Sequence, residues 1–411
     1  MKVDLLSVRH IRPVRLALIP ALGLLAAGTA AGNLSTPRAS ASVTLADIVS
    51  SFDANGAFVI GGQPTFPIGL SNPPPLDSRT PSGADGLDTV VNAGVTIFRV
   101  GPLTQPWSST TIDYAKAWDQ AALQRGVHTW VSLGDTAGSA VPGARSDRVL
   151  SYVVTSLLSD PSAGGLGLWK GADEPNRGGP ASTTLRFAYC RVTSRGPSSW
   201  CSGESSLDPN HLWVTIEAPL GTASQLGSYS KVTDTNGVDV YPVTMTAAHP
   251  DLHQVGTWTR TLASITPDHS VWTTLQICSS GSHDRSGDFV VPTRTQERYM
   301  IYDAIINGAR GLSFFGGDNP ACWDQSDKRT GWNWTYWNST LEPLVDEISA
   351  DSPIGPALAN PGSTRTLSTN DPHTEAISRL VQTPSGTQVW VLAAHDGTRA
   401  RTVTVTGLPG N

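Results

Sequence analysis

Two adjacent carboxylates, Asp173 and Glu174, follow a short apolar and glycine-rich run and precede Pro175 in the segment LWKGADEPN. A carboxyl group at the mouth of a cavity can have a raised pKa and act as a general acid. Proline restricts the residue before it to extended backbone, so we expect Glu174 to lie outside any helix. The structural alternative is that Asp173 caps a helix that starts at Pro175.

Three further acidic residues are candidates for a second catalytic carboxylate. Asp239 in GVDVYP precedes Tyr241 by two residues, and the period of a strand places both side chains on one side. Glu217 ends the run LWVTIE, and Asp318 follows FFGG. We rank them in the order Asp239, Glu217, Asp318. The structural alternative for Asp239 is an ion pair with an Arg or Lys of a neighbouring strand.

Aromatic residues crowd the segment CWDQSDKRTGWNWTYW, which contains Trp323, Trp332, Trp334, Tyr336 and Trp337. Flat aromatic rings suit the apolar faces of sugars, and their polar atoms can bond hydroxyl groups. The segment therefore predicts at least one carbohydrate platform. The alternative is that several of these rings fix the segment or pack under a C-terminal domain.

Two other chemistries have weaker support. The motif HPDLH, His249 to His253, has a spacing that could ligate a metal, but Pro250 indicates the start of a helix where histidine is commonly a cap or surface residue. We therefore predict no metal site and no cofactor. A serine hydrolase is also disfavoured, because the chain has no Gly-x-Ser-x-Gly elbow.

The elements that would position these residues alternate between short β-rich runs and amphipathic helical stretches. Eight runs are predicted as strands: 65–70, 96–100, 128–133, 166–171, 212–217, 237–242, 271–277 and 311–316. Eight such units predict a (β/α)8 barrel. A doubly wound sheet is the competing fold, but it would carry a glycine-rich phosphate turn where this chain has GLSNPPP. The carboxyl ends of barrel strands line the active site, which places Asp173 and Glu174 at its mouth.

After Pro353 the sequence changes to short alternating strands separated by turns, which predicts an all-β, sandwich-like domain. Three or so strands do not cover both faces of a sandwich, so the domain either packs on the barrel or is incomplete. The predicted organisation is a signal peptide at 1–41, a barrel at 42–352 and a β-rich domain at 353–411.

The N-terminal segment has the pattern of an export signal. Three arginines precede the apolar run LALIPALGLLAAGTAA, and Ala39–Ala41 fits a small-residue cleavage site. Pro20 and the Ala/Gly-rich end weaken the alternative of an uncleaved membrane anchor. We therefore expect a secreted or cell-envelope protein with no stable membrane insertion after cleavage. The net charge of −6 without a basic stripe disfavours nucleic acid as a partner.

The four cysteines suit an exported chain with two disulfides. Cys278 and Cys322 follow neighbouring predicted strands, whose exits lie together in a barrel. Cys190 and Cys201 bracket one segment between a helix and the fifth strand. We therefore predict the pairs Cys190–Cys201 and Cys278–Cys322, with free buried thiols as the alternative.

Taken in chain order, these motifs resemble the TIM-barrel glycoside hydrolases of the clan that includes β-galactosidases, β-mannanases and cellulases, over roughly 58–350. That clan carries Asn-Glu-Pro-like motifs after the fourth strand, with Glu as the acid/base, and Asp173-Glu174-Pro175 matches with Asp in place of Asn. Arg99 in FRVG and Tyr241 match the clan's strand-two Arg and strand-six Tyr. FVIGGQPTFPIGL resembles the hairpin before its first strand.

One position departs from the resemblance. The clan's nucleophile is a Glu that ends strand seven, whereas this chain has Gln276 there. An amide cannot form the usual glycosyl ester. The resemblance implies a secreted glycosidase that cleaves a poly- or oligosaccharide with Glu174 as acid/base. The alternatives are a carbohydrate-binding barrel without catalysis and a cell-envelope scaffold. The predicted substrate contacts are Arg99, Asp173, Tyr241, Gln276, Asp318, Trp323, Trp332 and Trp334.

Overall fold

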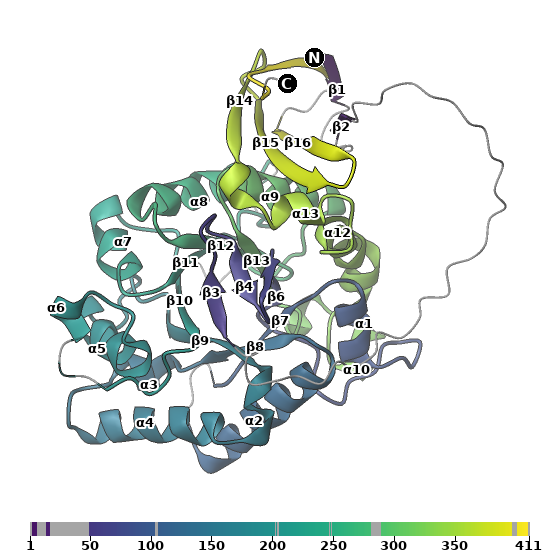
Figure 1. Ribbon diagram of the computed structural model, residues 1–411. Helices are drawn as coiled ribbons and strands as arrows, with labels where there is room; N and C mark the ends of the chain where they lie inside the picture. Colours follow the sequence, from purple (N-terminus) through teal and green to yellow (C-terminus); the bar gives the residue numbers. More distant parts are fainter. Residues whose placement is uncertain are drawn as a thin grey trace.

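A computed structural model describes residues 49–409 except 103–105, 202, 204, 246, 248, 281–288 and 397–400, and describes the backbone alone at 2–5, 14–16 and 161–162. Two units are visible in Figure 1, a ring of strands surrounded by helices and a C-terminal sheet beside it.

In this described part of the chain, eight parallel strands close into a barrel, which confirms the predicted fold. The strands are short apolar runs buried on both faces, as expected when helices cover the outside and side chains fill the interior. In chain order they are β6 (Ile68–Leu70), β7 (Ile97–Val100), β8 (His128–Ser132), β9 (Leu166–Asp173), β10 (Leu212–Glu217), β11 (Thr235–Asp239), β12 (Ser270–Gln276) and β13 (Gly311–Phe315).

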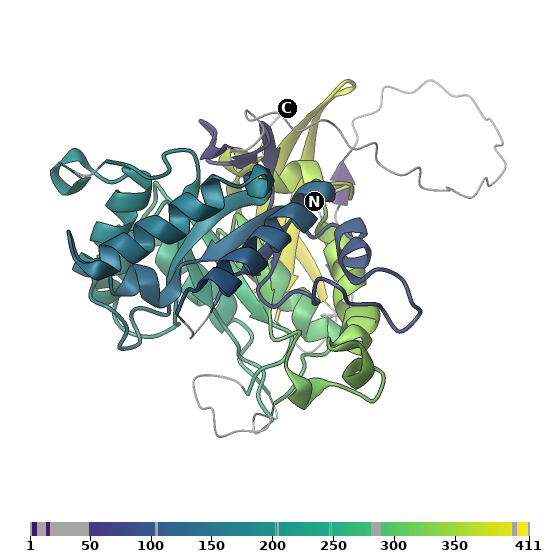
Figure 2. The ribbon, with the colours of Figure 1, turned by 90° about the horizontal axis from the view of Figure 1, so that it is seen from below.

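Helices follow the barrel strands and cover them from outside (Figure 2). Three of these helices begin with a capping box at Ser108, Thr222 and Thr293. Each of these side chains accepts a bond from the backbone amide of the third helical residue, whose side chain accepts one in return from the cap's backbone amide. The helices are α1 (Gly86–Asn92), α2 (Ser109–Gln124), α3 (Gly134–Gly138), α4 (Arg145–Leu158), α5 (Ser182–Thr193), α6 (Ser198–Cys201), α7 (Ala223–Ser230), α8 (Gln254–Ile265), α9 (Arg294–Ile306), α10 (Asp327–Thr330), α11 (Trp334–Tyr336), α12 (Glu342–Ile348) and α13 (Gly355–Leu358). The 3₁₀ turns are η2 (Pro161–Gly165), η3 (Pro320–Cys322) and η5 (Pro361–Ser363), and η4 (Trp337–Leu341) is a π-helical turn.

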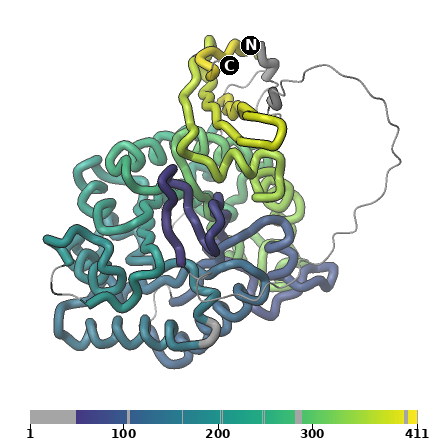
Figure 3. Tube along the Cα trace, viewed as in Figure 1, coloured from purple at the N-terminus to yellow at the C-terminus, as the bar shows by residue number. Residues whose placement is uncertain are grey.

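A small antiparallel sheet closes one end of the barrel. It consists of β3 (Ser50–Phe52), β4 (Phe58–Ile60) and β5 (Gln63–Thr65), and it crosses the centre of the ring in Figure 3. Phe58 packs edge-on against Trp272 at 5.5 Å between ring centroids. The hydroxyl of Ser50 accepts a bond from the amide of Leu212, at the start of β10. Because this sheet covers the amino ends of the strands, the open mouth lies at their carboxyl ends.

The C-terminal part is all-β, as predicted. Its strands are β14 (Arg365–Thr369), β15 (Thr374–Thr383), β16 (Gly386–His395) and β17 (Arg401–Thr406), joined by β1 (Lys2–Leu5) and β2 (Val14–Leu16). The order is β1-β17-β14-β15-β16-β2. Ile377, Trp390 and Leu392 belong to the same buried core as the barrel helices. The sheet is therefore packed on the barrel, one of the two arrangements expected from its few strands.

The N-terminal segment contributes two of these strands, since β1 pairs with β17 and β2 pairs with β16. Most of the predicted signal peptide, including its cleavage site at Ala39–Ala41, lies outside the described residues, so cleavage stays a prediction. Among the helices that the structure describes, none has the length and apolar character needed to cross a membrane.

Both predicted disulfides are confirmed. Cys190 and Cys201 join α5 to α6 with 5.0 Å between their Cα atoms. Cys278 and Cys322 are bonded with Cα atoms 6.1 Å apart. The second bond ties the segment after β12 to the segment after β13, because neighbouring parallel strands bring their exits together.

Candidate active site

A β-bulge in β9 places two charged side chains on one side of the strand. Lys170 pairs with Val214 of β10, but the next pair is Asp173 with Ile216, so three steps of β9 oppose two steps of β10. Residues three apart on a regular strand face opposite sides. The bulge therefore turns Asp173 to the side of Lys170, and the two form a close ion pair.

Lys170 and Arg99 supply positive charge beneath the mouth. Lys170 is 2% exposed and its ammonium lies 5.8 Å from the centre of the Trp130 ring. Arg99, 8% exposed, donates from Nε to the carbonyl oxygen of Ser71 at 2.7 Å. Burial raises the pKa of Asp173, but Lys170 and Arg99 outweigh burial and hold it below the ordinary value. Asp173 is therefore ionised and paired.

The structure places Glu174 beside Asp239. Burial, the charges of Glu174 and Asp173, and a hydrogen bond with Glu174 raise the pKa of Asp239 well above its ordinary value, while Lys170 acts in the opposite direction. Two carboxyl groups in hydrogen-bond contact cannot both ionise at low cost. Asp239 therefore keeps its proton at pH values where an ordinary aspartate is ionised.

The backbone of Glu174 differs from the sequence prediction. Its φ is +41°, in the left-handed region, so the extended conformation expected before Pro175 is wrong. The amide of Glu174 donates to the carbonyl of Ile216 at 2.9 Å, and its carbonyl accepts from the amide of Arg177 at 2.9 Å. The residues after it form a turn, and the next helix, α5, starts only at Ser182. The alternative of a helix cap at Asp173 is therefore also wrong.

Tyr241 lies beside the carboxyl pair, as predicted from its spacing to Asp239. Its ring stacks on Phe315 with centroids 5.5 Å apart. Burial and the neighbouring Asp239, Asp173 and Glu174 raise the pKa of the Tyr241 hydroxyl well above its ordinary value. Tyr241 is thus a neutral hydrogen-bond donor next to the acidic pair.

Gln276 has a structural role instead of the expected contact with substrate. It is fully buried, and its amide group bonds the backbone of Val243 in both directions. Its Oε1 accepts from the Val243 amide at 2.9 Å, and its Nε2 donates to the Val243 carbonyl at 3.1 Å. Both ends of the amide are used to fix the segment after β11, so Gln276 is not free to bind a ligand.

Glu217 lies away from the carboxyl pair. Its neighbour Ile216 belongs to the barrel interior, so Glu217 points outward to the helices. It is fully buried and accepts a bond from the hydroxyl of Ser230 in α7 at 2.8 Å. Burial raises the pKa of Glu217 to about 8. This side chain is a neutral carboxylic acid of the helix layer.

Most of the predicted aromatic platform is buried. Trp332 and Trp334 are 1% and 0% exposed, and the Trp332 indole donates to the carbonyl of Asn72 at 2.8 Å. Neither ring has a face free for a sugar, so the prediction of substrate contact is wrong for both. Trp323 is half-buried and donates to the carbonyl of Gly317 at 3.1 Å. These rings form the core of the segment after β13.

Asp318 is exposed at the mouth, where it accepts a bond from Asn72 at 3.1 Å. Its charge also acts on Arg99. Asp318 therefore lies near the cluster, at its rim, and its predicted contact with substrate stays a prediction.

Sequence reasoning missed Lys170, Asn72 and Asn176. Lys170 had a usable signal, because a lysine in the otherwise apolar run LGLWKGA needs an acidic partner when buried. Asn72 and Asn176 lie in irregular segments, where only the tertiary contacts reveal their partners.

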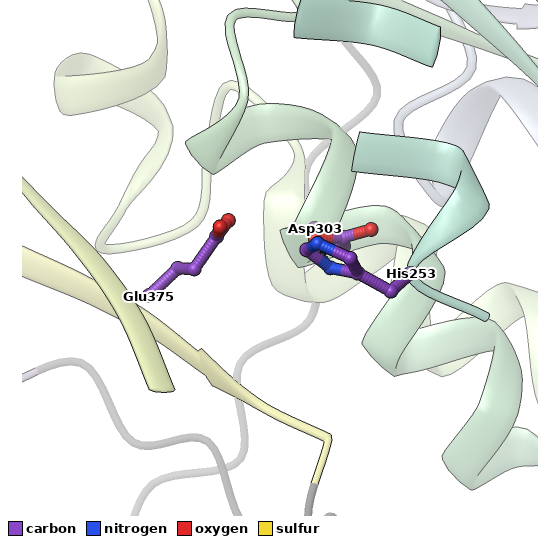
Figure 4. Close-up of side chains that lie close together, drawn as sticks. All are labelled: His253, Asp303 and Glu375. Atoms are coloured by element: carbon purple, nitrogen blue, oxygen red, sulfur yellow. Dashed lines mark ion pairs between the residues drawn. The ribbon is translucent and has the colours of Figure 1, made fainter. Parts of the chain in front are cut away.

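In the part of the chain that the structure describes, a group of possible metal ligands lies outside the barrel mouth and consists of His253, Asp303 and Glu375 (Figure 4). The amide of Asn307 donates to Asp303 at 3.0 Å and to Glu375 at 2.8 Å. The guanidinium of Arg260 donates to Glu375 at 3.1 Å. Protein donors already satisfy these oxygens, so the group joins barrel helices to the C-terminal sheet.

A cavity of about 440 Å³ opens beside α3 and α4. Its lining includes Asp135, Thr136, Arg145 and Val149, and none of the carboxyl cluster. It is separate from the acidic pair.

No protein-family model matches the chain, and no curated protein matches it. Similar solved structures include a glucosidase from Croceicoccus marinus, at 12% identity and a TM-score of 0.43, with 82% of each chain covered. A β-D-glucuronidase of Dictyoglomus thermophilum is 15% identical with a TM-score of 0.43, covering 75% of this chain and 54% of that one. A family 51 α-L-arabinofuranosidase from Bifidobacterium longum is 12% identical with a TM-score of 0.46, and the match covers 89% of this chain and 86% of that one. This chain thus spans about half the length of the glucuronidase.

Proposed function

We propose that this chain is a glycoside hydrolase in which Glu174 and Asp239 are the catalytic carboxyl groups. The observation that carries the proposal is that the two carboxyl groups are neighbours at the barrel mouth, with the pKa of Asp239 raised by burial and by Glu174. Glycoside hydrolysis requires a carboxylic acid and a carboxylate on either side of the scissile bond. Glu174 and Asp239 would supply these two groups.

We infer the roles of the pair from its surroundings. Asp239 lies deeper, at 9% exposure, where burial and Glu174 raise its pKa and Lys170 acts in the opposite direction. Glu174 lies nearer the surface and is bonded to Arg177 at 3.2 Å. When a sugar separates the two groups, Asp239 loses the repulsion from Glu174 that helps to raise its pKa, so it acts as the carboxylate while Glu174 gives a proton to the leaving oxygen.

A sugar bound between Glu174 and Asp239 would set the separation of the two carboxyl groups. The separation in the complex then decides the stereochemistry. A distance of about 5–5.5 Å makes Asp239 a nucleophile and retains configuration, whereas about 6.5–9.5 Å admits a water and inverts it. Arg99, Asp173, Tyr241 and Asp318 surround this space and would bind sugar hydroxyls.

We also propose that the protein is secreted and acts on an extracellular poly- or oligosaccharide. The export-like N-terminus and the two disulfides support this location.

The proposal is tested by screening the purified chain on glycans and aryl glycosides, followed by E174Q and D239N on every substrate that is cleaved. Each substitution should reduce kcat by about 10²–10⁴-fold, because it removes an acid–base group. E217Q is the matched control, since Glu217 is a buried carboxyl on the other face of the barrel wall. Turnover by E174Q and D239N equal to that of the parent contradicts the assignment.

A second candidate is a carbohydrate-binding barrel without catalysis. Gln276 supports it, because β12 ends in an amide that is committed to the Val243 backbone. Calorimetric binding of a glycan that the parent chain does not cleave would favour this candidate.

A further inference from the structure

The turn after β9 holds Glu174 in a conformation that its own sequence disfavours. The residue has a Cβ and a φ of +41°, and it precedes Pro175, which favours extended backbone. Such a conformation persists only where surrounding contacts determine it. Contacts outside the turn must therefore hold Glu174.

Asn176 makes those contacts. Its Nδ2 donates to the carbonyl oxygens of Ala218 at 2.9 Å and Leu220 at 3.1 Å. Its Oδ1 accepts from the amide of Ala218 at 2.9 Å. Both amide protons and the carbonyl of the side chain are thus engaged with the segment that follows β10. An aspartate at this position lacks both donors, and an alanine lacks all three bonds.

The barrel order shows why this attachment matters. β10 lies between β9, which leads to Glu174, and β11, which carries Asp239. The carboxyl group of Glu174 must therefore reach across the end of β10 to contact Asp239. The bond from the Glu174 amide to Ile216 and the three bonds of Asn176 fasten the turn to that strand end.

We propose that Asn176 is a positioning residue, which fixes the turn on the exit of β10 and thereby directs the Glu174 carboxyl group across β10 to Asp239. The placement of Glu174 by Asn176 follows from these contacts alone. The effect of that placement on catalysis rests on the proposed function.

The test uses N176A and N176D in the full chain, with N360A as the matched control. Asn360 is also half-buried and donates from its side chain to a backbone carbonyl, that of Leu380 at 2.8 Å, near the C-terminal sheet. Carboxyl ¹³C NMR titration measures Asp239 directly, with its signal assigned by its loss in D239N. In N176A the pKa of Asp239 should fall by about one unit or more, because Glu174 no longer faces it. N360A should titrate as the parent does.

Activity gives the second readout. On any cleaved glycoside, N176A should lower kcat by about 10- to 100-fold and change KM by less than about threefold, since the acid is displaced rather than removed. N176D keeps the acceptor for the Ala218 amide and remains informative if N176A does not fold. An unchanged Asp239 titration in both Asn176 variants, or an equal shift in N360A, overturns the proposal. A shifted titration in a chain that cleaves no glycoside contradicts the proposed function and leaves the positioning role intact.

Discussion

Glu297 of α9 gives a stability prediction that does not depend on activity. This carboxyl is fully buried and accepts a bond from the Tyr336 hydroxyl at 3.2 Å. Burial raises its pKa from 4.5 to about 8. Below pH 4.5 both the folded and unfolded states hold the proton. As pH rises to 8, only the unfolded state loses it, so the free energy of unfolding falls across this window and levels off above it.

The expected change in the free energy of unfolding follows from the difference between the pKa of Glu297 in the folded state and in the unfolded state. Each pH unit within the window costs about 1.4 kcal/mol, so the contribution of Glu297 to the free energy of unfolding falls by about 3–4 kcal/mol between pH 5 and pH 8. Glutamine has the same shape and does not titrate. Relative to the parent, E297Q should therefore gain about 3–4 kcal/mol in free energy of unfolding over this pH range.

Urea unfolding of parent and variant at pH 5 and pH 8 measures this difference. D113N, which changes an exposed carboxyl of α2, is the control and should follow the parent at both pH values. Parallel pH dependence of parent and E297Q would refute the reasoning, because it would mean that Glu297 titrates alike in both states.

Three further predictions concern other parts of the molecule. Replacing Cys278 and Cys322 together by serine should lower the free energy of unfolding by about 4 kcal/mol, since the bond closes a 44-residue separation; calorimetry under oxidising conditions checks this, and an unchanged transition contradicts it. Q276E should destabilise the fold by about 1–3 kcal/mol in denaturant unfolding, because it loses the donor to the Val243 carbonyl, and it should not increase turnover. The exported protein should begin after Ala41 and thus lack β1 and β2; intact-mass measurement of secreted material decides this, and a full-length mass contradicts signal cleavage.

The sequence predicted the barrel because its strands are short apolar runs with regular separations. The observed strands overlap all eight predicted ones, and β10 has the predicted bounds, Leu212–Glu217. The cysteine pairs followed from the same register, since strand order fixes which exits are neighbours. These are consequences of local pattern and topology, which a single sequence contains.

The site was less predictable because tertiary contacts override local preference. Proline favours extended backbone at Glu174, but bonds to the exit of β10 impose a positive φ. The bulge that turns Asp173 toward Lys170 has no separate signature in LGLWKGAD. Aromatic composition does not distinguish a ligand platform from a core, and Trp332 and Trp334 belong to the core.

The measurement that tests the catalytic pair most directly compares E174Q on two substrates that share a sugar and differ in leaving group. A poor leaving group, such as another sugar, needs the proton of Glu174, whereas an activated aryl leaving group does not. E174Q should therefore lose kcat/KM by at least about 100-fold more on the sugar leaving group than on the aryl one. An equal loss on both substrates, or no loss on either, would contradict the assignment of Glu174 as the general acid.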